Sequence, residues 1–401
     1  LPILEAKCVN CHNTDEAKGG LDLASYGATL NGGSGGAVVV SEDPKGEPIV
    51  VLMSGGVDSS LTAQLLMDTG WNPVGVTMRI PVVDGCGVSR PCCGTEAAFV
   101  CRDLGIPHYF VDTENTFRES VIEPFRQAYL NGQTPSPCVD CNTHLKFDLV
   151  WTAVEQQLGI RHLASGHYAK VEKDAESGAF YLRRAKDLLR DQSYFLYGIA
   201  AARLPFLHMP LGDFTKVEVR RMASARGMPV AAKPDSMEIC FVAGGDYRGL
   251  LQDAPAAPGP ICSLEGQVLG QHKGIHHYTI GQRKGLGISS KEGLYVVRIV
   301  PERNMVVVGP REAAFSSRVS ATAVNVLHAG ALKANALLWG KVRSVGEPQS
   351  CRITALGAHS IEVQFVQPLL TPAPGQHLVL YDERSTVVAG GVITNSGEVP
   401  A

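Results

Sequence analysis

The sequence predicts an α/β protein in which a doubly wound parallel sheet is followed by a small α+β domain and a C-terminal β-barrel. Three observations support this prediction. An apolar run at Ile49–Met53 leads through a glycine turn into a helix. Strand and helix patterns alternate from residue 49 to about 245, as they do when helices cover both faces of a parallel sheet. Short strands separated by turn signals recur from Val319 onward, as in a barrel.

Composition limits the classes of function. The chain has 401 residues, of which 45% are hydrophobic and 19% are charged, and its formal net charge is −3. This charge argues against a protein that binds polyanions over its whole surface, so contacts to nucleic acid must come from local basic patches. The sequence contains no uninterrupted apolar stretch of 18 residues and no signal peptide. We therefore expect a soluble, cytoplasmic protein that does not contact membranes.

The cysteines favour chemistry over structural disulfides. There are 11 of them, an odd number, and several form close pairs in sequence: Cys92 is next to Cys93, and Cys138 lies three residues before Cys141. In a long chain without export signals, this pattern favours redox, sulfur-carrying or metal chemistry.

The first 47 residues differ from the rest of the chain. Cys8, Cys11 and His12 have the spacing of a c-type haem attachment site, and the glycine-rich stretch that follows resembles the opening of small cytochrome-c-like modules. The stretch is too short for a complete cytochrome, and the first methionine, Met53, already belongs to the first predicted strand. We expect a disordered remnant and linker without a working haem; a zinc or redox role is the alternative.

The turn Ser54–Ser59 is suited to bind phosphate groups. Gly55 and Gly56 leave no Cβ to block an anion, and the helix that follows presents unpaired N–H groups and the positive end of its dipole. The spacing matches neither the usual ATPase loop with its lysine nor the dinucleotide fingerprint. Asp58 is expected either to contact magnesium or to cap the helix.

The predicted strands bring further residues to the same place. Strands are expected at Val74–Met78, His108–Val111 and His162–Ser165, and helices over 97–104, 119–130 and 145–158. The carboxyl ends of parallel strands share one edge of a sheet. Met78 and the sequence Ser165-Gly-His-Tyr168 should therefore lie near the glycine turn.

Two further segments carry cysteines. Pro135 and Pro137 stiffen the stretch that holds Cys138 and Cys141, two thiols close enough to reach one metal ion or each other. Cys240 follows a charged turn and lies in an apolar run.

Six motifs, in order, resemble those of the bacterial tRNA-specific 2-thiouridylases, which belong to the ATP pyrophosphatase superfamily with its phosphate-binding PP-loop. The resemblance covers about residues 48–396. The motifs are Ser-Gly-Gly-Val-Asp-Ser-Ser at 54–60, Thr-Pro-Ser-Pro with Cys-Asn at 134–142, Ser-Gly-His-Tyr at 165–168, Asp-Gln-Ser-Tyr-Phe-Leu at 191–196, Asp-Ser with Ile-Cys-Phe at 235–241, and Tyr-Thr-Ile-Gly-Gln-Arg-Lys-Gly-Leu-Gly at 278–287.

The resemblance implies an adenine nucleotide hydrolase-like fold and a reaction. ATP adenylates the 2-oxygen of the wobble uridine in tRNAs for Lys, Glu and Gln, and sulfur from a cysteine persulfide replaces that oxygen, which makes the enzyme a tRNA-uridine 2-sulfurtransferase. Mg²⁺ accompanies ATP. The partners are the tRNA anticodon stem-loop and a sulfur-relay donor protein or cysteine desulfurase. The implied domains are the catalytic domain at 48–245, a small tRNA-binding domain at 246–310 and the barrel at 311–401.

The same resemblance assigns residues. Cys240 would carry the persulfide, and Cys141 would be the second thiol. The implied nucleotide contacts are Leu52, Met53, Ser54, Gly55, Gly56, Val57, Asp58, Ser59, Met78 and Gly166. The implied tRNA contacts are Ser136, Pro137, Cys138, His167, Arg190, Asp191, Gln192, Arg343, Ser344 and Gln376. Further phosphate contacts are expected from Arg183, Arg184, Lys186, Arg220 and Arg221.

One departure from the family pattern opens an alternative. Cys138 stands where a common family version has Asp, and Cys138, Cys141 and Cys240 together could bind an iron–sulfur cluster that carries sulfide. The persulfide route is our expectation. Other functions to be tested are another PP-loop ligase that modifies tRNA, a haem electron carrier, and a tRNA-binding module without activity.

Overall fold

The computed structural model describes residues 46–81, 94–235, 239–242, 247–251, 257–290, 293–370 and 372–394. Predictions for the stretch at 8–12, and for Cys92 and Cys93, lie outside these residues. The chain forms two compact units. The first comprises Leu1–Arg118, Cys141–Ser193 and Ala202–Gly244, and the second comprises Glu119–Asp140, Tyr194–Ala201 and Gly245–Ala401.

The first unit is built on a five-stranded sheet in which every pairing is parallel, with the strand order β3-β2-β1-β4-β7. The strands are β1 (Pro48–Leu52), β2 (Asn72–Arg79), β3 (His108–Asp112), β4 (Leu163–Ser165) and β7 (Leu207–His208). The order reverses between β1 and β4, since β2 and β3 extend the sheet on one side and β4 and β7 on the other. Open α/β sheets bind ligands at such a switch point, outside the carboxyl ends of the strands.

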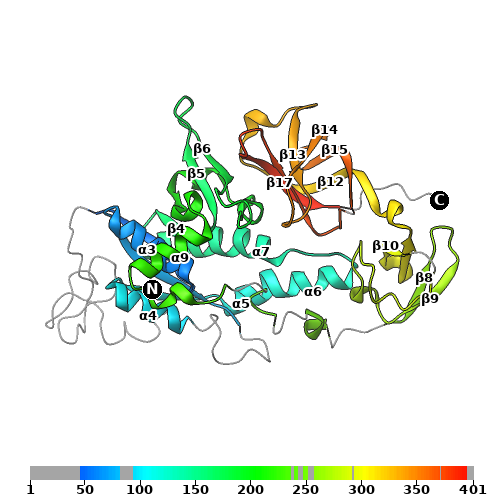
Figure 1. Ribbon diagram of the computed structural model, residues 1–401, viewed down its shortest axis with the longest axis horizontal. Helices are drawn as coiled ribbons and strands as arrows, with labels where there is room; N and C mark the ends of the chain where they lie inside the picture. The colour runs from blue at the N-terminus through cyan, green and yellow to red at the C-terminus, as the bar shows by residue number, and fades with distance from the viewer. Residues whose placement is uncertain are drawn as a thin grey trace. The chain divides into compact units, whose positions relative to one another are not determined.

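The helices of the first unit include α3 (Val57–Asp68), α4 (Thr95–Leu104), α8 (Trp151–Leu158) and α9 (Lys216–Ala225). Helix α3 packs on two sides: its buried Leu66 joins a core with β1 and α4, and its buried Leu61 joins a core with α9. Figure 1 shows α3 and α9 side by side. The doubly wound α/β fold predicted from the sequence is confirmed.

Two expected helices contain π-helical turns. The first consists of α5 (Glu114–Phe117), a π segment (Arg118–Ile122) and α6 (Glu123–Leu130). The second begins with α7 (Pro137–Asp140) and continues as a π segment (Cys141–Val150) into α8. Such i→i+5 turns are rare and occur often at functional sites. Cys141 is the first residue of the longer π segment.

The sequence reasoning missed several elements. A hairpin of β5 (Ala169–Lys173) and β6 (Phe180–Arg184) follows β4, and neither this hairpin nor α9 was predicted. Short 3₁₀ turns connect other elements: Ser193–Leu196, Ala201–Phe206, Pro210–Asp213, Pro229–Ala232, Tyr247–Leu251, Ile275–His277, Pro301–Arg303, Arg311–Ala314 and Ala329–Ala331.

The second unit contains two sheets. A four-stranded sheet has the order β10-β11-β8-β9. Its strands are β8 (Gly259–Cys262), β9 (Val268–His272), β10 (Tyr295–Val300) and β11 (Met305–Gly309). A closed barrel has the order β12-β15-β14-β13-β16-β17, which confirms the predicted barrel. Its strands are β12 (Phe315–Val326), β13 (Leu337–Lys341), β14 (Gln349–Leu356), β15 (Ser360–Leu370), β16 (His377–Tyr381) and β17 (Val387–Ile393).

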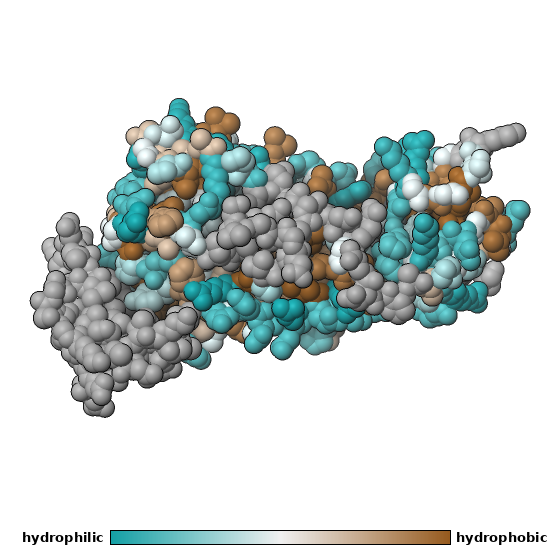
Figure 2. All heavy atoms as spheres, turned by 90° about the horizontal axis from the view of Figure 1, so that it is seen from below, coloured by the Kyte–Doolittle hydropathy of each residue, from teal (hydrophilic) through white to brown (hydrophobic). Residues whose placement is uncertain are grey.

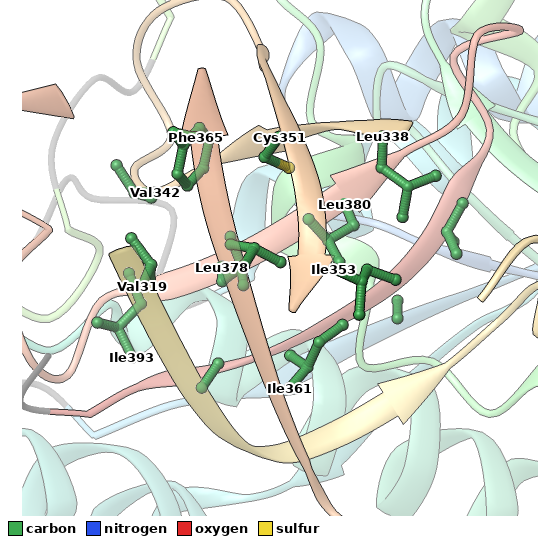
Figure 3. Packing of buried hydrophobic residues seen from close by; sticks show 14 residues of the cluster. Val319, Leu338, Val342, Cys351, Ile353, Ile361, Phe365, Leu378, Leu380 and Ile393 are labelled. Atoms are coloured by element: carbon green, nitrogen blue, oxygen red, sulfur yellow. The ribbon is translucent and has the colours of Figure 1, made fainter. Parts of the chain in front are cut away.

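Alternating residues of the barrel strands fill its interior. Figure 3 shows Phe365, Cys351, Leu378 and Leu380 gathered between the strands, and each of them is at most 2% exposed. Closure pairs every strand on both sides, so the barrel has no open edge.

The outer surface is mixed. On the face drawn in Figure 2, hydrophilic and hydrophobic side chains lie in small neighbouring groups. Within the described part of the chain, no helix is both long enough and apolar enough to span a membrane.

Candidate active site

The turn after β1 has the geometry of an anion-binding loop. Gly56 occupies the cap position of α3, and the hydroxyls of Ser59 and Ser60 donate to its carbonyl at 3.2 and 2.8 Å. Gly55 has a φ of +71°, which favours glycine. Asp58 lies in the first turn of α3, so the alternative that Asp58 caps the helix is wrong.

A second helix begins against the same loop. A Cβ at Gly55 would lie 2.8 Å from Glu96 Cβ and 2.9 Å from the backbone nitrogen of Ala97, both in the first turn of α4. The amino ends of α3 and α4 therefore meet at this glycine. Two helix dipoles with their positive ends close together favour a negatively charged ligand.

The end of β4 closes the other side of the loop. In the parallel register Leu52 pairs with Ser165, and a Cβ at Gly166 would lie 2.9 Å from both Asp58 C and Ser59 N. The expectation that the Ser165–Tyr168 motif lies beside the glycine turn is confirmed. Gly166 is needed there because the backbone of α3 leaves no room for a side chain.

The remaining predicted nucleotide contacts surround this loop. Met53 is 3% exposed and belongs to the core below it. Met78 lies near the carboxyl end of β2, where it pairs with Val111 of β3, and it is partly exposed. Leu52 ends β1, and Val57 is buried at the start of α3.

A network of charges adjoins the loop. Lys216 Nζ donates to both carboxylate oxygens of Asp58 at 2.7 and 2.8 Å and forms an ion pair of 2.9 Å with Asp235. Tyr168 Oη donates to Asp58 at 2.8 Å. Arg220 and Arg190 contact Asp235 at 2.7 and 3.2 Å.

Asp235 stays ionised in this network. Burial raises its pKa, but the hydrogen bond and charge of Lys216, together with the charges of Arg220 and Arg190, outweigh burial and hold the pKa below its ordinary value. Burial, followed by the neighbouring Asp58, raises the pKa of Tyr168, so its hydroxyl keeps its proton and remains a donor.

The structure corrects the role expected for Asp191. Its side chain is 1% exposed, and its carboxylate accepts hydrogen bonds from Arg184 Nε at 3.0 Å, Ala185 N at 3.1 Å and Ser193 Oγ at 2.9 Å. A carboxylate that is buried and satisfied in this way cannot contact RNA directly. It shapes the loop that carries Arg190 and Gln192.

Gln192 and His167 lie next to Tyr168. Gln192 Oε1 accepts from Tyr168 N at 2.8 Å. His167 Nδ1 lies 2.6 Å from Ser165 Oγ, and burial, with a smaller contribution from Lys146, lowers its pKa to about 3. His167 is therefore neutral at pH 7, so it can serve as a hydrogen-bonding group but not as a cation for RNA.

Cys141 and Cys240 belong to the same compact unit as the glycine loop. Cys141 is 7% exposed, whereas Cys240 is exposed. The next residue, Phe241, is 2% exposed and packs edge-to-face on Phe117 with ring centroids 5.5 Å apart. This contact anchors the Cys240 segment to the first unit.

Lys233 contacts the glycine loop: its Nζ donates to the Gly55 carbonyl at 3.3 Å and forms an ion pair with Glu96.

Cys138 is exposed and belongs to the second unit. In the parts of the chain that the structure describes, no group of three or more His, Cys, Asp or Glu side chains is arranged to hold a metal ion. The described residues therefore show no donor set for the alternative iron–sulfur cluster.

The remaining predicted tRNA contacts lie in the second unit. Gln376 Nε2 donates to the Thr134 carbonyl at 2.8 Å, next to the segment of Ser136 and Pro137. Arg343 donates to the Leu370 carbonyl at 3.2 Å and lines a cavity of about 330 Å³ at the end of the barrel. The Ser344 carbonyl accepts from Lys341 Nζ at 2.9 Å.

The expected phosphate contacts are mostly paired within the protein. Arg184 is buried against Asp191 and is excluded as a phosphate contact. Arg183 pairs with Glu172, Lys186 with Glu218, and Arg220 with Asp235. Arg221 is exposed.

Sequence reasoning missed Lys216. Its helix does carry a sequence signal, since Thr215 and Glu218 form a capping box in the structure and have the Thr-x-x-Glu spacing that announces one.

Family models match most of the chain. The model described as "tRNA methyl transferase HUP domain" matches residues 47–244, and the model described as "tRNA methyl transferase PRC-barrel domain" matches residues 249–310. The model described as "Aminomethyltransferase beta-barrel domain" matches residues 319–393. A model described as "Planctomycete cytochrome C" matches residues 8–61.

Curated relatives match over nearly their full length. The tRNA-specific 2-thiouridylase MnmA of Xanthobacter autotrophicus is 43% identical over 89% of this chain and 95% of its own. The tRNA-specific 2-thiouridylase MnmA of Methylorubrum populi is 44% identical over 88% of this chain and 95% of its own. Among solved structures, the U34-tRNA thiolase NcsA from Methanococcus maripaludis with its 4Fe–4S cluster is 16% identical, with a TM-score of 0.32 over 49% of this chain and 63% of that one. At 43–44% identity over almost the whole length of these relatives, the chain belongs to the family of tRNA-specific 2-thiouridylases.

Proposed function

We propose that this chain is an ATP-dependent tRNA-uridine 2-sulfurtransferase that converts the wobble uridine of tRNAs for Lys, Glu and Gln into 2-thiouridine. One observation supports this most strongly. The anion-binding loop, which lies between the amino ends of two helices, belongs to the same compact unit as Cys141 and Cys240. Family membership supports the choice of substrate.

The first step activates an oxygen that is a poor leaving group. The triphosphate of ATP lies on Ser54–Ser59, and its adenosine extends toward Met78 and Gly166. The uracil 2-oxygen attacks the α-phosphorus, the bond to the β-phosphate breaks, pyrophosphate leaves, and the base loses its N3 proton. Asp58 and the phosphates would hold Mg²⁺, which neutralises the charge of the departing pyrophosphate.

The second step exchanges oxygen for sulfur. The outer sulfur of a persulfide on Cys240 attacks carbon 2, and the adenylated oxygen leaves as AMP. The thiolate of Cys141 then attacks Sγ of Cys240, which breaks the S–S bond, leaves the outer sulfur on the base and forms a Cys141–Cys240 disulfide. An external thiol reductant restores both cysteines, and a sulfur-relay protein or cysteine desulfurase reloads Cys240.

The tRNA must present its base outside the stack, because carbon 2 is inaccessible in a stacked anticodon. We assign Ser136, Pro137, Cys138, His167, Arg190 and Gln192 to contacts around this base, and Arg343, Ser344 and Gln376 to contacts farther along the tRNA. Asp191 acts as a positioning residue, since it is buried.

The test is nucleoside mass spectrometry of unthiolated tRNA incubated with the protein, Mg-ATP and a persulfide donor. Wild-type protein should exchange one oxygen for one sulfur on the wobble uridine. Cys141→Ser and Cys240→Ser should abolish this exchange and still release pyrophosphate with tRNA present, because adenylation needs neither thiol. Cys262→Ala, in β8 of the second unit, is the matched control and should keep full activity.

Two outcomes would favour other functions. Full turnover in both serine variants would indicate another PP-loop ligase that modifies tRNA. Iron and sulfide in anaerobically purified protein, lost in Cys138→Ser together with thiolation, would indicate the cluster route.

A further inference from the structure

The phosphate loop itself carries no full positive charge. Residues 54–59 contain no lysine or arginine, and the amino ends of the neighbouring helices supply only partial charges. A lysine from another helix lies next to the loop, since Lys216 Nζ is 2.7 and 2.8 Å from the two carboxylate oxygens of Asp58. The proposed chemistry assigns no role to this lysine.

Packing alone does not explain Lys216. The residue is only 8% exposed, and burying an ammonium group is costly unless it is paired and hydrogen-bonded. Helices α3 and α9 are already joined by an apolar core that includes Leu61 and Val219. An apolar residue at position 216 would extend this core without the cost of a buried charge. The lysine therefore indicates that a positive charge is needed at this place.

The side chain of Lys216 is held at both ends. Its backbone nitrogen donates to Asp187 Oδ2 at 2.9 Å, and the capping box of Thr215 and Glu218 defines the start of the helix. Its ammonium group forms the ion pair of 2.9 Å with Asp235. The ammonium group is therefore in place beside the loop and needs no large rearrangement to meet a ligand there.

The charges around this lysine favour an anion. Three cationic side chains take part in the network, those of Lys216, Arg190 and Arg220. They meet two carboxylates, those of Asp58 and Asp235, so positive charges exceed negative charges by one. The network therefore attracts a negatively charged group placed beside Asp58. Lys216 provides the direct contact between these cations and the loop.

We propose that Lys216 is a phosphate-binding residue that supplies, from α9, the cation that the glycine loop lacks. The inference rests on the proposed function, because its ligand is the triphosphate of ATP. When the nucleotide binds, one of the three ammonium donors turns from an Asp58 oxygen to a phosphate oxygen. The other two donors keep their contacts with Asp58 and Asp235, so the lysine stays in place.

The experiment compares Mg-ATP with adenosine, which has no phosphate, by calorimetry on the full chain. In Lys216→Met, ATP should bind roughly tenfold to 100-fold more weakly, as expected for the loss of a hydrogen bond between charged groups. The affinity for adenosine should stay at its wild-type value, which also shows that the variant is folded. Lys216→Arg, which keeps the charge, should recover part of the affinity for ATP.

The matched control lies at the other ends of the same two helices. Arg226, after α9, pairs with Asp68, the last residue of α3, at 2.8 Å. Arg226→Met removes an ion pair between the same helices without touching the phosphate loop. This variant should bind both ATP and adenosine as the wild-type protein does.

The ratio of the two affinities separates a phosphate contact from a structural role. Equal weakening of ATP and adenosine in Lys216→Met would overturn the inference, because the lysine would then support the whole site. Unchanged ATP affinity in Lys216→Met, or an equal loss in Arg226→Met, would overturn it as well. Wild-type protein that binds no ATP would refute the proposed function and the inference together, whereas normal wild-type binding with any of these results refutes the inference alone.

Discussion

At the scale of single residues, the site depends on positions where no side chain fits. Gly166→Ala would place a Cβ 2.9 Å from Asp58 C and Ser59 N, closer than such atoms approach in proteins. Because these are backbone atoms, the first turn of α3 must shift, and the phosphate loop shifts with it. We expect Gly166→Ala to weaken ATP binding at least tenfold, which corresponds to about 1.4 kcal/mol, measured by calorimetry.

The control for this prediction is Gly249→Ala. A Cβ there meets no atom within 4 Å, so binding should equal that of wild type. Unchanged ATP affinity in Gly166→Ala would show that the turn beside α3 does not bind the nucleotide.

At the scale of elements, α9 matters because it carries Lys216 and Arg220. Its start is fixed by a capping box in which Thr215 Oγ1 accepts from Glu218 N, and Glu218 Oε2 accepts from Thr215 N at 2.7 Å. Loss of a threonine cap costs about 1 kcal/mol. In Thr215→Ala, the amide hydrogens of α9 that exchange by local opening should therefore exchange about fivefold faster. Hydrogen-exchange mass spectrometry measures this change.

Helix α8 in the same sample serves as the internal control and should exchange at its wild-type rate. Thr215→Ser keeps the hydroxyl and should restore protection of α9. Faster exchange throughout the first unit would mean that the threonine supports the whole sheet rather than the helix start.

At the scale of the whole molecule, buried histidines make stability depend on pH. His377 in β16 is 2% exposed, lies 2.8 Å from Tyr197 Oη through its Nδ1, and has a pKa lowered to about 4 by burial. Unfolded, its pKa is about 6.5. Between these values the unfolded chain binds more protons, so stability is full above pH 6.5 and is lost as pH falls toward 4.

His377→Gln should remove this contribution. From pH 6.5 to pH 5, wild-type protein should lose about 1.6 kcal/mol more unfolding free energy than the variant, measured by urea unfolding. His108 and His208 in the first unit, with pKa values also lowered to about 4, act in the same direction and remain in both proteins. Equal losses in the two proteins would show that His377 is solvated in the folded state.

The sequence by itself determined the α/β class, the barrel, the glycine loop and the motif after β4. These features depend on local signals: apolar periodicity, glycine where a backbone must pass close by, and strand ends that share an edge. Only the tertiary structure decided that Asp191 and Arg184 are a buried pair and that Lys216 joins Asp58 to Asp235. Lys216 lies 158 positions from Asp58 and 19 positions from Asp235 in the sequence. Such ion pairs form when separate elements pack together, so no periodic pattern within a single element predicts them.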